Sequence, residues 1–183
     1  MLENQIKQML LDVARGAIYS KIYNKEIIDK EELVEKFPNF AKRAATFVTL
    51  YLDGELRGSV GSLVAHKTLL DDLTLNAYKS AFDDERFEPL TKEEFEKIEI
   101  EISLLSQPLE IRYENLSDLK SKINIGIDGV IIRQDKKQAT FLPQVWEHLP
   151  EFDDFLTHLF HNAGITDLDT MIEVFVYNVE VIK

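Results

Sequence analysis

Apolar residues recur at helical spacing in the first part of the chain. The repeating positions are Ile6, Met9, Leu10, Val13, Ala17 and Ile18. This pattern predicts an amphipathic helix over about residues 3–22. A second, short helix is predicted after Asp29, which caps its start while Glu32 completes a capping-box-like pair. It ends by Phe37-Pro38, because the residue before a proline disfavours helical backbone.

The pattern then changes to that of a β-hairpin. Residues 46–52 are rich in β-branched and aromatic side chains and lead into Asp53-Gly54, a dipeptide that favours a type I′ turn. The returning strand is predicted over residues 55–63. Gly58 and Gly61 lie inside it and pack nothing, so they indicate a bulge or a close approach to the backbone.

Two further helix starts surround a polar connection. Thr68 with Asp71 opens one helix, and Thr91 with Glu94 opens a shorter one. Isoleucines then alternate with polar residues over 98–104, which predicts a strand with one buried face and one solvent-exposed face.

The last third of the chain predicts another hairpin, a helix and a strand. A short helix near residues 117–122 precedes a hairpin over 126–144 with its turn at 135–138. An apolar stripe over 152–160 predicts a helix closed by Gly164. The final run, 171–182, is apolar on both faces from Val174 to Tyr177, as in a central strand.

This order of elements predicts an α+β fold. Hairpins and meanders outnumber βαβ units, so we expect a mainly antiparallel sheet with helices packed on one face. We expect a single domain over residues 1–183, with a smaller second lobe built from about residues 23–45 and 105–125.

Composition narrows the classes of function. The 183 residues are 45% hydrophobic, enough for a sizeable core, and their formal charge of −12 disfavours nucleic acid. The absence of cysteine excludes disulfides and thiolate chemistry. We expect no membrane span, because no apolar run approaches about 20 residues, and the polar start lacks the core of a signal peptide. A cytoplasmic location is predicted.

Three blocks, in conserved order along the chain, carry a family resemblance. They are TFVTLYLDGELRGSVGSL, then AFDDERFEPLTKEEFEKIEIEISLLSQP, then GIDGVIIRQDKKQATFLPQVW with FLTHLFHNAGI. Together they resemble the AMMECR domain, called protein A of the AmmeMemoRadiSam system, over roughly residues 5–180. The resemblance implies an accessory or enzymatic component associated with Memo-like and radical SAM proteins. It implies no substrate or reaction, and whether the protein is an enzyme stays open.

The family's most characteristic block is Leu-Arg-Gly-Cys-Ile-Gly, and here Ser59 stands in the cysteine position. A hydroxyl is far less acidic than a thiol, so thiolate chemistry by the family route is not available at this position. Arg57 between small residues can bring its guanidinium, with exposed backbone N–H groups, to a carboxylate or phosphate. The alternative is a structural bulge with Arg57 in an ion pair.

Two further matches to the family supply candidate ligand-binding residues. Arg86 and Phe87 follow an acidic run, so Arg86 either binds an anion with Arg57 or pairs with its acidic neighbours while Phe87 fills the core. Gln144 ends a strand and either presents its amide to a ligand or satisfies a loop backbone. The candidate ligand-binding set is Arg57, Gly58, Ser59, Gly61, Arg86 and Gln144.

Other chemistry has weaker support. His158 and His161 share a helix face with Asp154, but the H-E-x-x-H context of a metal site is missing, and we predict no metal or cofactor. No phosphate-binding loop motif is present. The leading hypothesis is therefore a small anionic ligand bound near the Leu56–Gly61 block. The alternatives are a non-catalytic scaffold module for Memo-like or radical SAM proteins, and an enzyme that uses Ser59 as nucleophile.

Overall fold

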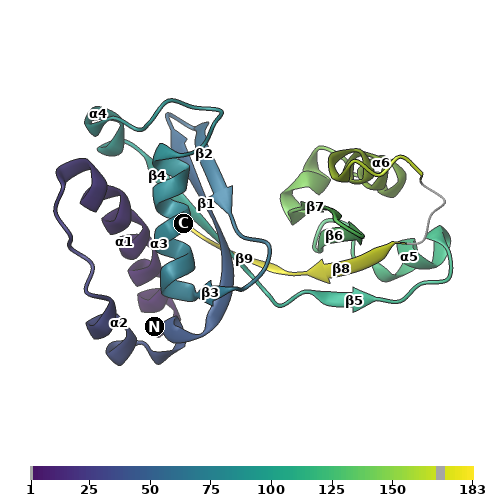
Figure 1. The fold of residues 1–183 in the computed structure, drawn as a ribbon, viewed down its shortest axis with the longest axis horizontal. Helices are drawn as coiled ribbons and strands as arrows, with labels where there is room; N and C mark the ends of the chain where they lie inside the picture. The colour runs from purple at the N-terminus through teal and green to yellow at the C-terminus, as the bar shows by residue number, and fades with distance from the viewer. Residues whose placement is uncertain (1, 168–171) are drawn as a thin grey trace. The chain divides into compact units, whose positions relative to one another are not determined.

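The computed structural model describes residues 2–167 and 172–183, and the chain divides into two compact units (Figure 1). The first unit comprises Met1–Leu105 with Glu180–Lys183, and the second comprises Ser106–Val179. Each unit has its own hydrophobic core.

The first unit is a sheet with helices. Its elements are α1 (Leu2–Tyr23), α2 (Lys30–Lys36), the 3-10 helix η1 (Pro38–Ala41), β1 (Arg43–Leu52), β2 (Glu55–Gly61), β3 (Lys67–Thr68), α3 (Leu69–Phe82), α4 (Lys92–Phe95), β4 (Glu99–Leu105) and β9 (Val179–Ile182). The strand order is β2-β1-β4-β9, and β3 pairs with the start of β1. Strand β1 is antiparallel to β2, β3 and β4.

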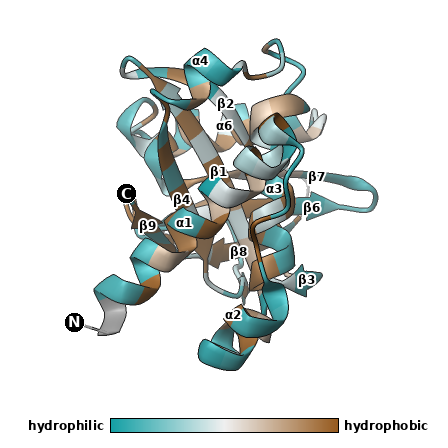
Figure 2. Cartoon of the chain, turned by 90° about the vertical axis from the view of Figure 1, so that its left-hand side faces the viewer, coloured by the Kyte–Doolittle hydropathy of each residue, from teal (hydrophilic) through white to brown (hydrophobic). Residues whose placement is uncertain are grey.

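Helices α1 and α3 pack on one face of this sheet (Figure 1). The fully buried side chains of Ile18, Leu73 and Val48 come from α1, α3 and β1 and belong to one core. Figure 2 shows β1 and β4 as largely hydrophobic and α2 as largely hydrophilic, and α2 buries no residue. The predicted α+β class, with antiparallel strands and helices on one face, is confirmed.

Local signals in the sequence set the element ends. The side chains of Asp29, Thr68 and Thr91 accept backbone hydrogen bonds at the starts of α2, α3 and α4, and Thr91 with Glu94 forms a full capping box. Asp53 and Gly54 both have positive φ, 52° and 82°, as a type I′ turn requires.

A buried carboxylate ties α3 to the sheet. Asp72 is 1% exposed. It accepts hydrogen bonds from the backbone and hydroxyl of Thr46, both at 2.8 Å, from Asn76 Nδ2 at 3.0 Å and from Ser62 Oγ at 2.6 Å. Four donors therefore compensate the burial of this charge.

The predicted strand 98–104 is observed as β4, but its second face is not solvent-exposed as predicted. Glu101 is 8% exposed and Ser103 is 3% exposed. Glu99 is exposed as predicted, but the prediction was wrong at Glu101 and Ser103, because alternation along one strand does not show which side chains of other elements lie against that face. Lys183, just beyond β9, pairs with Glu101 at 2.7 Å.

The second unit has a four-stranded sheet. Its elements are β5 (Leu109–Ile111), α5 (Leu116–Lys122), β6 (Gly129–Gln134), β7 (Lys137–Phe141), the 3-10 helix η2 (Pro143–Glu147), α6 (Phe152–Ala163) and β8 (Glu173–Tyr177). The strand order β5-β8-β6-β7 confirms β8 as a central strand. Trp146 stacks on Phe155 of α6 at 3.5 Å between ring centroids, and Gly164 ends α6 with φ 70°.

Two boundaries differ from expectation. Gln134 pairs with Lys137, so the second hairpin turns over two residues rather than four. The predicted strand 171–182 divides into β8 and β9, which join different sheets, and Met171 lies outside the described residues. Residues 106–125 lie in the second unit, whereas 23–45 lie in the first, where Phe40 is buried. A single domain over 1–183 stays a prediction.

Candidate functional site

Strand β2 contains a bulge at Arg57. Gly58 pairs with Leu50 and Leu56 pairs with Tyr51, so Arg57 has no cross-strand partner. The predicted irregularity in this strand is therefore observed, one residue before the first glycine. The extra residue sends the Arg57 side chain toward α4 and the connection that precedes it.

The Arg57 guanidinium is held by Glu94 of α4. Arg57 Nε donates to Glu94 Oε1 at 2.8 Å, and Nη2 donates to Oε2 at 3.0 Å and to the Glu88 carbonyl at 2.9 Å. This two-point pair lowers the pKa of Glu94 to about 2. Nη1 of Arg57 is buried and has no hydrogen-bond partner within the described residues.

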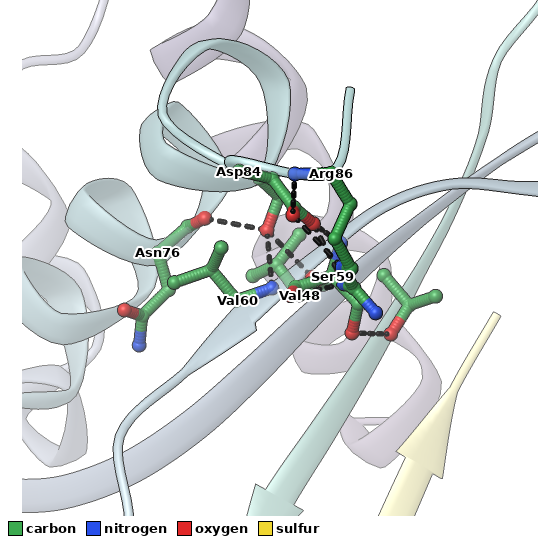
Figure 3. A network of polar contacts seen from close by, with 8 residues as sticks. Val48, Ser59, Val60, Asn76, Asp84 and Arg86 are labelled. Atoms are coloured by element: carbon green, nitrogen blue, oxygen red, sulfur yellow. Dashed lines mark hydrogen bonds and ion pairs between the residues drawn. The ribbon is translucent and has the colours of Figure 1, made fainter.

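Asp84 and Arg86 clamp the outer edge of β2 (Figure 3). The Ser59 N–H donates to Asp84 Oδ2 at 2.8 Å, and Arg86 Nη2 donates to the Ser59 carbonyl at 3.0 Å. Arg86 also donates to Asp84 through Nε at 2.9 Å and Nη2 at 2.7 Å. The pair thus satisfies both outward backbone groups of Ser59, as a neighbouring strand would.

The contact between Asp84 and Arg86 shifts the pKa values of both side chains. The Arg86 hydrogen bonds hold the pKa of Asp84 well below its usual range, and Asp84 in turn raises the pKa of Arg86. Asp84 is nearly buried, with 6% of its side chain exposed, whereas 55% of the Arg86 side chain remains exposed. Phe87 lies beneath both guanidinium groups, 5.7 Å from that of Arg57 and 5.6 Å from that of Arg86.

The two glycines of the block make room for the protein itself. A Cβ at Gly58 would lie 2.1 Å from the Ser80 carbonyl oxygen of α3, and a Cβ at Gly61 would lie 2.2 Å from the Phe47 ring. The close approach predicted at both positions is observed, and it comes from α3 and β1.

This approach lets a serine of α3 enter the β1–β2 ladder (Figure 3). Ser80 Oγ accepts from the Val60 N–H at 2.9 Å and lies 2.7 Å from the Val48 carbonyl and 2.8 Å from the Asn76 carbonyl, which share its single proton. The hydroxyl links the Val60 N–H of β2 to the Val48 carbonyl of β1. Gly58 is therefore required by packing.

Ser59 is fixed through its backbone and carries a half-buried hydroxyl. Its Oγ lies 2.9 Å from Oγ1 of Thr49, directly across on β1. That partner is neither a histidine nor a carboxylate, so it supplies no base to activate the hydroxyl.

The structure brings together five of the six predicted site residues. Arg57, Gly58, Ser59 and Gly61 lie on β2, and Arg86 contacts Ser59. Gln144 lies in η2 of the second unit, and its Oε1 is buried with no partner among the described residues. The acids Asp84 and Glu94, which neutralise the two arginines, were predicted only as part of an acidic run and as a cap.

The arrangement resembles no metal site. Within residues 2–167 and 172–183, no group of three or more histidine, aspartate or glutamate side chains is placed to hold a metal ion. His158 Nδ1 contacts the backbone carbonyl of Asp154 at 2.8 Å instead. No helix in the described part of the chain is long and apolar enough to cross a membrane.

Comparison with known proteins shows the family to which the chain is related. The AMMECR1 family model matches residues 11–182. The chain belongs to the AMMECR1 family. A Methanothermobacter thermautotrophicus protein is 33% identical over 158 residues, which cover 85% of this chain and 81% of that protein. A Methanocaldococcus jannaschii protein is 34% identical over 156 residues, covering 83% of this chain and 75% of the relative.

The fold is shared with a solved structure. The crystal structure of the uncharacterised protein PH0010 from Pyrococcus horikoshii matches with a TM-score of 0.81 and 28% sequence identity. The match covers 94% of this chain and 88% of that one. The α+β fold predicted from the sequence is thereby confirmed in a second way.

Proposed function

We propose that this AMMECR1-family protein binds a small ligand with a single carboxylate at Arg57, Ser59 and Arg86, which we name the bulge site. The observation that carries the proposal is the buried, unpartnered Nη1 of Arg57. Nη1 is covered by the protein, so a ligand would enter at the Arg86 side chain, 55% of which is exposed. A buried charged donor without an acceptor costs on the order of 1–3 kcal/mol, which favours a local rearrangement that brings a ligand acceptor to Nη1.

The charges of the bulge site select the class of ligand. Two guanidinium groups are matched by the carboxylates of Asp84 and Glu94, so the site has little net positive charge. The second charge of a dianion would be repelled by those carboxylates. A monocarboxylate can instead bind the exposed edge of Arg86 and the hydroxyl of Ser59. Gln144 stays a separate prediction as a ligand residue of the second unit.

The test is a thermal-shift and calorimetric screen of the whole chain against small mono- and dicarboxylates. Arg57→Gln combined with Glu94→Gln removes the pair without leaving a buried charge, and Lys97→Gln is the control on the exposed surface. A monocarboxylate that stabilises the native protein and the control, but not the double variant, is the expected result. Equal binding by the double variant would exclude the bulge site.

The second candidate function is a non-catalytic scaffold module for Memo-like or radical SAM proteins, as the family association implies. Its contact point would be Leu56, which is 41% exposed beside Arg57. The Asp84–Arg86 clamp already satisfies Ser59, so a partner would contact side chains there rather than extend the sheet. Co-purification with either partner, lost on Leu56→Asp, would support this function. The cytoplasmic location stays a prediction.

A further inference from the structure

A cavity of about 770 Å³ in the first unit is separate from the bulge site. It lies between α1, residues 26–30, the start of β1 and the first half of α3, and it includes none of Arg57, Ser59 and Arg86. We name it the basic hollow, defined by Lys30, Arg43, His66, Lys67 and Tyr78.

Strand pairing gathers cations from distant segments around the basic hollow. Arg43 at the start of β1 lies opposite Thr68 of β3, and Ala44 lies opposite Lys67. The side chains of Arg43 and Lys67 make no hydrogen bond or ion pair with residues 2–167 and 172–183. With 33 acidic and 21 basic residues in the chain, two cations whose side chains form no ion pair at one cavity indicate a place for an external anion.

The acidic residues of the cavity are already engaged. Asp71 pairs with Lys30 at 2.7 Å and accepts a hydrogen bond from Thr68 Oγ1 at 2.8 Å. Glu26 accepts from the Ile28 N–H at 3.1 Å and from Ser20 Oγ at 3.4 Å. Repulsion of an incoming anion by these acids is therefore reduced, and Lys67 also attracts Asp71.

The start of α3 does not supply the anion contacts. The Leu69 N–H donates to the Lys42 carbonyl at 2.8 Å, and the Asp71 N–H donates to Thr68 Oγ1 at 3.2 Å. Both amides are satisfied within the chain, so the side chains of the cavity have to hold the anion.

Part of the cavity lining is apolar. Ala17 of α1, Ile28 and Leu75 line it together with Tyr78. The Tyr78 ring is half-buried and lies 5.3 Å from that of Phe82, which restricts its motion. A flat apolar or aromatic group can therefore pack against Leu75 and Tyr78.

We propose that the basic hollow binds a small organic phosphate monoester, with its phosphate at Arg43 and Lys67 and its apolar body against Tyr78. A phosphate monoester carries a charge of about −1.5 to −2 at neutral pH, which matches two cations better than a carboxylate does. Guanidinium and ammonium groups are the donors that phosphate oxygens bind most strongly.

The test titrates the whole protein with phenyl phosphate at low ionic strength and follows ligand binding by 31P NMR. Arg43→Gln with Lys67→Gln removes two exposed cations and should preserve the fold. Lys36→Gln with Lys97→Gln makes the same change in net charge elsewhere. We expect the first double variant to weaken binding at least about tenfold and the second to leave it nearly unchanged.

Matched ligands and a third variant separate the two halves of the proposal. Inorganic phosphate should bind more weakly than phenyl phosphate, and Tyr78→Ala should weaken only phenyl phosphate. Absence of binding to the native protein, or equal binding by both double variants, would overturn the phosphate site. Equal affinity for inorganic and phenyl phosphate would overturn the role of Tyr78. These variants leave the bulge site intact, so either proposal can fail alone.

Discussion

Gly58→Ala is the sharpest test of how the bulge site is built. The new Cβ would lie 2.1 Å from the Ser80 carbonyl oxygen and 3.1 Å from its carbonyl carbon. Carbon–oxygen contacts are ordinarily about 3.3 Å or longer, so α3 and β2 have to separate by roughly 1 Å. The atom in the way is backbone, so no side-chain rotation can relieve the contact.

The free energy of unfolding should fall by about 2–4 kcal/mol. Overpacking costs about 1–3 kcal/mol. Separating α3 from β2 also weakens the hydrogen bonds of Ser80 Oγ to Val60 and Val48, each of which contributes about 1 kcal/mol. Alanine restricts the unfolded chain and returns about 0.4–1 kcal/mol.

Urea unfolding followed by far-UV circular dichroism measures this loss. Trp146 is the single tryptophan and lies in the second unit, so its fluorescence reports on that unit separately. Gly16→Ala is the matched control. Its Cβ would meet the flexible Ile28 side chain at 3.2 Å inside a helix, where alanine is favoured over glycine by about 1 kcal/mol.

The control should therefore be as stable as the native protein or slightly more stable. If Gly58→Ala behaved like Gly16→Ala, the contact between α3 and β2 would not constrain this position. Gly58 would then be needed for something outside the chain, such as a ligand that approaches the backbone.

Two further predictions concern carboxylates. The pKa of Glu94 is lowered to about 2, so its pairing with Arg57 stabilises the fold above about pH 4.5 and this contribution is lost as the pH falls toward 2. Because the pair is partly solvent-exposed, Glu94→Gln should remove only about 1–2 kcal/mol of that pH-dependent stability. Glu93→Gln, at an exposed position, should leave the pH-dependent stability unchanged. Acid titrations monitored by circular dichroism measure both effects. Asp72→Ala removes the acceptor of four hydrogen bonds and should cost about 3–5 kcal/mol in urea unfolding. Asp71→Ala, at the exposed Lys30 pair, should cost about 1 kcal/mol.

Short-range signals explain why so many elements were predicted correctly. The caps at Asp29, Thr68 and Thr91 and the Asp53-Gly54 turn depend on neighbours within four residues, which a sequence displays directly. The exposure predicted for Glu101 failed because burial there depends on a strand about 80 residues later, and alternation along β4 carries no information about it.

The sequence predicted the two arginines of the site but not the acids that pair with them. The sequence placed Arg57 and Arg86 as candidates near one block, and the structure does bring them to one aromatic ring. Which acid neutralises each arginine could not be predicted, because Asp84 and Glu94 are members of an acid-rich stretch and only the path of the chain selects them.

The first two family blocks, which contain Gly58 and Asp84, contact each other in the structure. Gly58 in the first block lets α3 approach, and the clamp of Asp84 and Arg86 in the second block then holds the backbone of Ser59. An arginine that is tied to its own acid loses much of its attraction for a second anion. It follows that Arg57 Nη1 carries the case for a ligand at the bulge site, whereas the phosphate proposal relies on the unpaired Arg43 and Lys67.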